Sequence, residues 1–551
     1  MILSNNNINM VFNENSLLID CVFLGDGTTV CTQGKQAVSV RIPKAASEPV
    51  LLSHTQLCEI QTNKIRIIFE DDSKKYQAEM WIESTDIGIR FKMSVTAPEP
   101  IWLIEWKLTS IDVDEFIIPA LGGQLLTRDM PDDMTLSYKY PFWWNSQFTI
   151  GNRESGGLWL FSRDMRPNLK LLRIGKHQDR FALSYGYEAS APLNSKRLEA
   201  EWYIDGFSGD WREPVDIHRQ WLENTFDLKE VDSRLDRYPW AKNVNFVLEI
   251  WGARRDSEMP MHTFDQMIDR LHEWKTMHVP EQTLVYLPGF AENGIDTHIP
   301  NYNPSERCGG AGKFKELVDT AHDLGYRVMI HTNVLGMTYN HRLFPKFKEY
   351  QVVDCFERSQ GWAMDLDGDW LAEPYFAYIN PGVKAWGDLM KQVIGELVES
   401  YDIDAVFLDQ TLLAFNDRNY PNFLHGMRAH IEELQASFPN VLFAGEGMHE
   451  HVLNPLSFAQ IHGIDSVAEV HGMDGQYQWR QVHPVSTYLF GRYVKFVAHL
   501  LTRHPSHPIF RFQEASYAKL GVLPALCLYD HSQPIGTEQV SHMIERAKKI
   551  K

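Results

Sequence analysis

Two acidic residues of this 551-residue chain each stand at the end of a short apolar run. In YDIDAVFLDQT (residues 401–411) the run ends at Asp409, and in NVLFAGEG (440–447) it ends at Glu446. Such runs predict buried parallel strands, because helices cover both faces of a parallel sheet. Two neighbouring strands that end in carboxylates would present both to one cleft, which is the arrangement that glycoside hydrolysis requires. Each acid alone could instead cap a helix or lie in a solvated turn, but two in succession favour the catalytic interpretation.

Polar and aromatic residues recur at the ends of the other predicted strands. In a (β/α)8 barrel, side chains at the carboxyl ends of the strands line the catalytic mouth. We therefore predict substrate contacts from Glu249, Trp251, His331, Asn333, Gln410, His449, His471 and Asp530. Two tryptophans outside the strands are added as aromatic surfaces for a sugar ring. Trp362 lies in a long insertion at 334–379, and Trp143 lies in YPFWWN (140–145), either in a core or in a loop over the barrel mouth.

The chain divides into two patterns, which predict a multidomain β plus α/β protein. Up to about residue 230, short alternating strands without helices between them predict an antiparallel β-sandwich and a linker helix. Examples of these strands are 64–70, 77–83, 87–95, 101–108, 157–162, 181–187 and 198–204. From 231 to 551, strands alternate with helices, which predicts one TIM (β/α)8 barrel. Its strands are expected at 244–250, 283–287, 327–333, 403–409, 440–447, 466–470, 509–512 and 523–529.

Composition narrows the class of partner and the compartment. The formal net charge of −19 argues against nucleic acid or an anionic membrane surface as a partner. The six cysteines show no CxxC pair, so we expect free thiols and no metal site. No apolar stretch reaches the length of a membrane span, and the N-terminus lacks the pattern of a signal peptide. We expect a cytoplasmic protein without a cofactor, and the sequence leaves the oligomeric state open, a homo-oligomer included.

Several segments resemble known glycosidases. Three barrel segments are similar to the third to fifth strand motifs of the retaining alpha-galactosidase/alpha-glucosidase clan and the alpha-amylase superfamily: GYRVMIHTNVLGMTYNH (325–341), IDAVFLDQT (403–411) and LFAGEG (442–447). Three N-terminal segments resemble uncharacterised glycosidase-like proteins with a β-sandwich before the barrel: FIIPALGG (116–123), ESGGLWLFSRD (154–164) and GDWREPVDIHRQWL (209–222). The resemblance implies Asp409 as the nucleophile. It leaves the acid/base open between Glu446, by the amylase-like pattern, and Glu469, by the galactosidase-like pattern.

We therefore expect a glycoside hydrolase of carbohydrate metabolism that acts on an oligosaccharide or glycoside by a retaining mechanism. Asp409 should stay ionised, whereas a less solvated Glu446 should hold a proton. One alternative is a carbohydrate-binding barrel that has lost catalysis. A less favoured one is a metal-dependent hydrolase that uses His331, Glu446 and His471. The sugar, its linkage, the anomeric preference and exo or endo action lie beyond the sequence.

Overall fold

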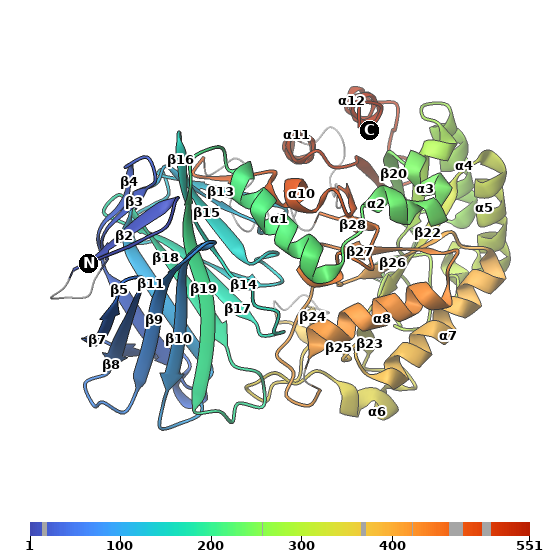
Figure 1. Cartoon of the computed structure of the whole chain (residues 1–551). Coiled ribbons are helices and arrows are strands. Elements are labelled where there is room, and N and C mark those ends of the chain that lie inside the picture. Colours follow the sequence, from blue (N-terminus) through green and yellow to red (C-terminus); the bar gives the residue numbers. More distant parts are fainter. Residues whose placement is uncertain are drawn as a thin grey trace. The chain divides into compact units, whose positions relative to one another are not determined.

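The computed structural model of the chain describes residues 1–13, 19–255, 257–364, 371–420, 422–461, 478–498 and 508–550. The chain forms two compact units (Figure 1). Unit 1 comprises Met1–Thr225 and Tyr477–Leu489, and unit 2 comprises Phe226–Gln476 and Phe490–Lys551. Each unit has its own strand pattern, and the two are described separately.

Unit 1 contains two large antiparallel sheets. The first has the order β1 (Ile2–Ser4), β2 (Ile8–Phe12), β3 (Ile19–Leu24), β4 (Thr29–Gly34), β11 (Leu103–Ile111), β18 (Arg180–Glu188), β17 (Lys170–His177) and β14 (Thr135–Tyr140). β5 (Gln36–Arg41) also pairs with β11, and β6 (Val50–Leu52) pairs with β5. The second has the order β29 (Arg480–Val482), β13 (Gln124–Thr127), β12 (Glu115–Ile118), β15 (Phe148–Arg153), β16 (Gly156–Phe161), β19 (Arg197–Phe207), β10 (Gly88–Thr96), β9 (Gln77–Thr85), β8 (Lys64–Glu70) and β7 (His54–Gln61).

The two sheets share one core, as a β-sandwich requires. Strand β8, KIRIIFE, buries every second residue, because successive side chains of a strand point to opposite faces. Trp106 of the first sheet packs on Phe91 and Trp202 of the second, with ring centroids 5.2 and 5.3 Å apart. The strands predicted for the N-terminal half are confirmed, with ends that differ by up to three residues.

A late segment of the chain completes the second sheet. Strand β29 pairs with β13, so that Gln124 lies opposite Val482 and Leu126 opposite Arg480. The buried Arg480 guanidinium donates to Gln124 Oε1 from Nε and Nη2, at 3.1 and 3.0 Å. Unit 1 is therefore assembled from two segments of the chain that the barrel sequence separates.

Unit 2 contains a parallel barrel of eight strands among the described residues. Their order is β20 (Phe246–Ile250), β21 (Thr283–Leu287), β22 (Arg327–Asn333), β26 (Ala405–Asp409), β27 (Leu442–Glu446), β28 (Phe458–Gln460), β30 (Lys495–Val497) and β31 (Ala525–Leu528). β31 pairs with β20, and a parallel bridge between Val497 and Leu523 links the other end of this order. Val406 lies opposite Phe443 in one sheet, which confirms that the two acid-bearing strands are neighbours.

Helices follow most strands of the barrel, and Figure 1 shows α4, α5, α7 and α8 around it. The longer helices of unit 2 are α4 (Phe264–Lys275), α5 (Gly310–Leu324), α7 (Lys384–Tyr401), α8 (Phe423–Ser437), α11 (Pro508–Leu520) and α12 (Glu538–Ala547). The shorter ones are α2 (Val231–Arg234), α3 (Pro239–Asn243) and α6 (Phe344–Phe347). Helix α1 (Arg212–Phe226) crosses the unit boundary, and α10 (Val485–Phe490) follows β29. No helix among the described residues is long and apolar enough to cross a membrane.

The sixth and seventh barrel strands differ from the sequence prediction. The sixth strand is β28, and the segment predicted for it, 466–470, lies outside the described residues. The seventh strand is β30, and the prediction of a strand at 509–512 is wrong, because these residues belong to helix α11. Both true strands have only three residues, too few to show a periodicity. The apolar pair Ile509 and Phe510 with Phe512 fits one face of a helix as well as a strand.

The insertion after β22 has its own antiparallel sheet. Its strand order is β23 (Gly336–Thr338), β25 (Glu373–Tyr378) and β24 (Gly361–Met364). Residues 365–370, which include Trp370, lie outside the described residues. Strand β25 ends at Tyr378, and only residues 379–383 separate it from the barrel helix α7.

Candidate active site

Asp409 and Glu446 are the last residues of the adjacent strands β26 and β27. The residue after Asp409, Gln410, has a positive φ of 66°, a region that non-glycine residues seldom adopt and that often marks functional sites. The backbone N–H of Gln410 donates to Glu446 Oε2 at 3.0 Å. Thr411 Oγ1 donates to the backbone oxygen of Glu446 at 2.9 Å. The turn after β26 therefore fixes the Glu446 carboxylate beside Asp409.

Asn333 orients Asp409 from the other side. It ends β22 and lies opposite Asp409 in the sheet. Its Nδ2 donates to Asp409 Oδ2 and to Gln410 Oε1, both at 3.2 Å. Its Oδ1 accepts from the backbone N–H groups of Leu335 (3.2 Å) and Gly336 (2.6 Å). All the polar atoms of this buried amide are thus engaged, so its orientation is fixed.

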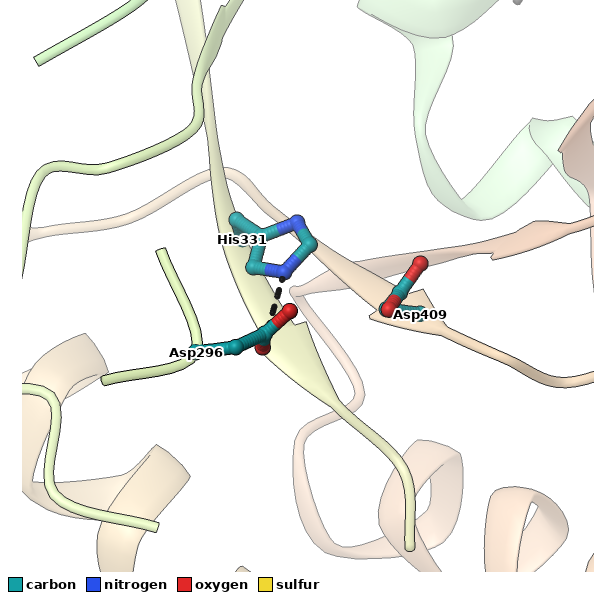
Figure 2. A group of neighbouring side chains, drawn as sticks. All are labelled: Asp296, His331 and Asp409. Atoms are coloured by element: carbon teal, nitrogen blue, oxygen red, sulfur yellow. Dashed lines mark ion pairs between the residues drawn. The ribbon is translucent and has the colours of Figure 1, made fainter. Parts of the chain in front are cut away.

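A third carboxylate, Asp296, comes from the loop after β21 and was not predicted. Its Oδ1 lies 3.6 Å from His331 Nε2, and both atoms are buried without a hydrogen-bond partner among the described residues. The other ring nitrogen of His331 bonds the Tyr286 hydroxyl at 2.7 Å. Figure 2 shows the Asp296 carboxylate and the His331 ring turned toward each other, with Asp409 nearby. One ligand atom from each of the three lies within 4.8 Å of the others.

Asp296 was not predicted as a site residue because it does not end a strand. It stands in a loop of glycine, asparagine and histidine, NGIDTHIP (293–300). The polar residues of this loop could have indicated a site residue, because the loops after barrel strands build the catalytic mouth. The Asp296–His331–Asp409 group offers one nitrogen and two carboxylate oxygens, a set that could hold a divalent cation or hydrogen-bond to sugar hydroxyls.

Partial burial raises the pKa of the Asp409 carboxyl well above its ordinary value, and the charges of Glu446 and then Asp296 add to this effect. The N–H of Gln410 acts in the opposite direction. The raised pKa of Asp409 runs against the expectation that this carboxyl stays ionised. Two interacting carboxyl groups titrate as a pair, so the raised pKa of Asp409 partly reflects its repulsion by the neighbouring Glu446 carboxylate.

The insertion contributes one tyrosine beside Gln410 and a row of aromatic rings that leads from it to a tryptophan. The hydroxyl of buried Tyr378, in β25, accepts a hydrogen bond from Gln410 Nε2 at 3.4 Å. Burial and the charge of Asp409 raise the Tyr378 pKa. From Tyr378 a row of rings continues through Phe376 (5.8 Å) to Trp362 (6.3 Å, nearly parallel), which is 44% exposed. Tyr378 was not predicted; the predicted Trp362 reaches the site only through this row.

The remaining predicted residues of unit 2 have varied settings. Buried Glu249 accepts from Trp251 Nε1 at 2.7 Å, and burial raises the pKa of the nearby Tyr286, with Glu249 as the next cause. His449 is buried, and burial lowers its pKa to about 4. Asp530 is largely exposed and accepts from the N–H of Ser532 at 2.8 Å, so it caps a turn.

Three predicted residues belong to unit 1 or lie outside the described residues. Trp143 belongs to unit 1, where it packs against the hydrophobic core. Glu469 and His471 lie outside the described residues. The alternative acid Glu469, and the metal-site alternative that includes His471, therefore stay predictions.

Comparisons with known proteins show the fold. The chain is similar to the ligand-free structure of the alpha-N-acetylgalactosaminidase NagBb from Bifidobacterium bifidum, with a TM-score of 0.75 and 13% identity over 100% of this chain and 93% of that one. The GalNAc complex of the same protein gives a TM-score of 0.73 at 13% identity, over 100% and 92%. A GH36 alpha-galactosidase, AgaA from Geobacillus stearothermophilus, in complex with raffinose, gives 0.50 at 11%, over 96% and 75%.

Sequence comparison gives one family match. A family model described as a domain of unknown function (DUF6259) matches residues 197–496, more than half of the chain. No curated protein matches the sequence. The chain thus shares its architecture, a β-sandwich followed by a (β/α)8 barrel, with structurally known glycosidases at low identity.

Proposed function

The chain belongs to the DUF6259 family, a domain of unknown function, and on this premise we propose that it is a retaining glycoside hydrolase. The observation that carries the proposal is the carboxylate pair Asp409 and Glu446 on adjacent strand ends. Asn333 and the N–H of Gln410 hold the two carboxylates in place. Retaining enzymes need such a pair close together, whereas inverting enzymes need room for a water between them.

In the proposed mechanism Asp409 attacks the anomeric carbon, and Glu446 gives its proton to the leaving oxygen. This step requires an ionised Asp409 and a proton on Glu446. Asn333 Nδ2, which donates to Asp409 Oδ2 at 3.2 Å, supports the ionised form of Asp409. Once Asp409 is esterified to the sugar its negative charge is gone, so an ionised Glu446 no longer faces a like charge at that position. Glu446 can then act as a base toward the incoming water.

The unpartnered atoms of Asp296 and His331 supply the contacts for the bound sugar. Their oxygen and nitrogen, 3.6 Å apart, can each take part in a hydrogen bond with one hydroxyl placed between them. A buried polar atom without a partner costs free energy, and a substrate hydroxyl that satisfies it restores this energy. Tyr378 and, farther out, Trp362 provide apolar surface for sugar rings.

A panel of aryl glycosides tests the proposal, headed by the alpha-N-acetylgalactosaminide because of the likeness to NagBb. Asp409→Ala should abolish turnover. Glu446→Ala should spare substrates with good leaving groups at the first step, and azide should then accelerate the second step. Asp402→Asn, at the exposed C-cap of helix α7 just before β26, is the matched control and should retain turnover.

The outcomes separate the proposal from its rivals. A glycosyl azide of retained configuration from Asp409→Ala and one of inverted configuration from Glu446→Ala would exchange the two roles, because azide replaces the nucleophile in one case and attacks the glycosyl-enzyme in the other. Saccharide binding without any hydrolysis would favour a carbohydrate-binding barrel. Turnover that a chelator abolishes and a divalent cation restores would favour a metal-dependent hydrolase built on Asp296, His331 and Asp409.

A further inference from the structure

Unit 1 has a pocket of about 310 Å³ on the outer face of its first sheet, formed by β5, β6, β11, β14, β17 and β18. The volume lies at the lower end of the range, about 300–1,000 Å³, of small-molecule sites. All its lining residues belong to unit 1, so no carboxylate of the barrel lines it. Neither the proposed catalysis nor the sandwich core needs it.

The strand register explains why this face is hollow. Lys107 of β11 lies opposite Ala37 on one side and Ser184 on the other. Gly175 of β17 lies opposite Ala182 and Thr135. The intervening residues point to the other face, where they fill the core. The floor of the pocket is therefore built from the smallest side chains, and longer ones rise at its margin.

The charged side chains of the pocket are predominantly basic. Arg41, Lys107 and Arg173 line it with a single carboxylate, Glu105. Glu105 pairs with Arg173 at 3.1 Å, which leaves two cations unbalanced. Lys107 is exposed and has no ion pair within the part of the chain that the structure describes. In a chain of net charge −19, this excess of positive charge favours an anionic ligand.

Two further features point to a ligand. Arg41 Nη1 donates to the backbone oxygen of Ala46 at 2.8 Å, while its Nε is buried without a hydrogen-bond partner in the described structure. The hydroxyls of Ser39, Thr135 and Ser184 also line the pocket, and the described residues offer them no hydrogen bond. Guanidinium and ammonium groups bind carboxylates and sulfates, and hydroxyls suit the neighbouring oxygens of a sugar.

We propose that this pocket binds a saccharide through an anionic group, a carboxylate or a sulfate. The choice of a saccharide rests on the proposed function, whereas the anion site rests on the residues of unit 1 alone. A neutral sugar is less well matched, because no aromatic side chain lines the pocket to stack against a ring. The pocket would hold an acidic residue of a carbohydrate chain.

Calorimetric titration of the full chain tests this with D-glucuronate, galactose 6-sulfate, galactose and inorganic sulfate. The titrations use the catalytic double variant Asp409→Asn/Glu446→Gln, so that hydrolysis cannot contribute to the measured heat. Lys107→Ser should weaken binding of both acidic sugars about tenfold, the value expected for one lost charge-assisted hydrogen bond. Lys139→Ser, an exposed lysine of β14 that does not line the pocket, should leave affinity unchanged.

A second variant keeps the charges and removes the space. Ala182→Leu fills the floor and should abolish binding, while melting temperature and circular dichroism show that unit 1 stays folded. Failure of all four probes to bind would overturn the proposal, as would acidic-sugar affinity that neither variant changes. Sulfate bound as tightly as galactose 6-sulfate would overturn its saccharide part. Hydrolysis that fails on every glycoside, with binding intact, would refute the proposed function and leave the anion site standing.

Discussion

Replacing Asp409 by Asn should stabilise unit 2 while abolishing turnover. An oxygen of Asp409 lies within 4.8 Å of one of Asp296, and the Glu446 carboxylate is a further like charge. At an effective dielectric constant of about 20, two unit charges at that separation repel by roughly 3.5 kcal/mol. Partial exposure and proton uptake relieve part of this repulsion. The gain from Asp409→Asn at pH 8 should then be about 1–3 kcal/mol.

The stabilisation should depend on pH in one direction. The pKa of Asp409 is raised in the folded state, above an unfolded value of about 3.9. The folded wild type therefore binds more protons than the unfolded chain, and it loses stability as the pH rises from about 4 through the folded pKa. Asparagine does not titrate, so the gain from Asp409→Asn should be near zero at pH 4 and complete above the folded pKa.

Scanning calorimetry at several pH values is the assay. Unit 2 has roughly 310 residues, and at about 2.1 cal/mol/K per residue a gain of about 2 kcal/mol raises its melting temperature by about 3 °C. Asp112→Asn is the control, because ion pairs with Arg128 and Arg180 lower the pKa of Asp112 against the effect of burial; it should destabilise unit 1 at pH 8. A melting temperature for Asp409→Asn at or below that of the wild type at pH 8 would refute the reasoning, as would a gain independent of pH.

Three further predictions concern positioning, the row of rings and the backbone. Asn333→Ala should lower kcat about 100-fold by releasing Asp409, and a loss confined to KM would contradict a positioning role. Trp362→Ala should change stability by less than about 0.5 kcal/mol and raise KM for oligosaccharides but not for aryl monosaccharides; equal effects on both would exclude an outer contact. Gly123→Ala should destabilise unit 1 by about 3 kcal/mol or more, because φ is +113° and a Cβ would lie 1.9 Å from the backbone oxygen of His483. Gly312→Ala in α5, where a Cβ would have no atom within 4 Å, should instead stabilise unit 2 by up to about 1 kcal/mol. Calorimetry compares the two variants.

Two kinds of strand were predictable: those in which apolar and polar residues alternate over seven or more positions, and those that form a continuous apolar run between two helices. Such patterns reflect burial on one face or on both faces, which depends little on the rest of the fold. The three-residue strands β28 and β30 have no such pattern, since their position is fixed by pairing within the barrel. The apolar residues of 509–512 are compatible with a strand and with a helix, and in the structure they belong to helix α11.

For the site, the sequence predicted Asp409 and Glu446 on adjacent strands because both carboxylates end recognisable strands. Asp296 and Tyr378 were not found, because a loop and an inserted sheet bring them close to Asp409. Their positions depend on tertiary contacts that local patterns do not encode. The raised pKa of Asp409 was not expected from the sequence. Burial is its largest cause, followed by the charge of Glu446 and then by the charge of Asp296, whose position was unknown from the sequence.

The segment that returns to unit 1 has a consequence for synthesis on the ribosome. The edge of β13 that β29 covers is complete only after the chain has grown from Thr225 to Val482. At about 5–20 residues per second, that interval lasts roughly 13 to 50 s. Throughout it, the backbone groups of Gln124 and Leu126 stand at an open sheet edge, the kind of surface to which other nascent chains can add a strand. Unit 1 therefore stays incomplete until most of unit 2 has been synthesised, and a chain that stalls within the barrel leaves both units incomplete.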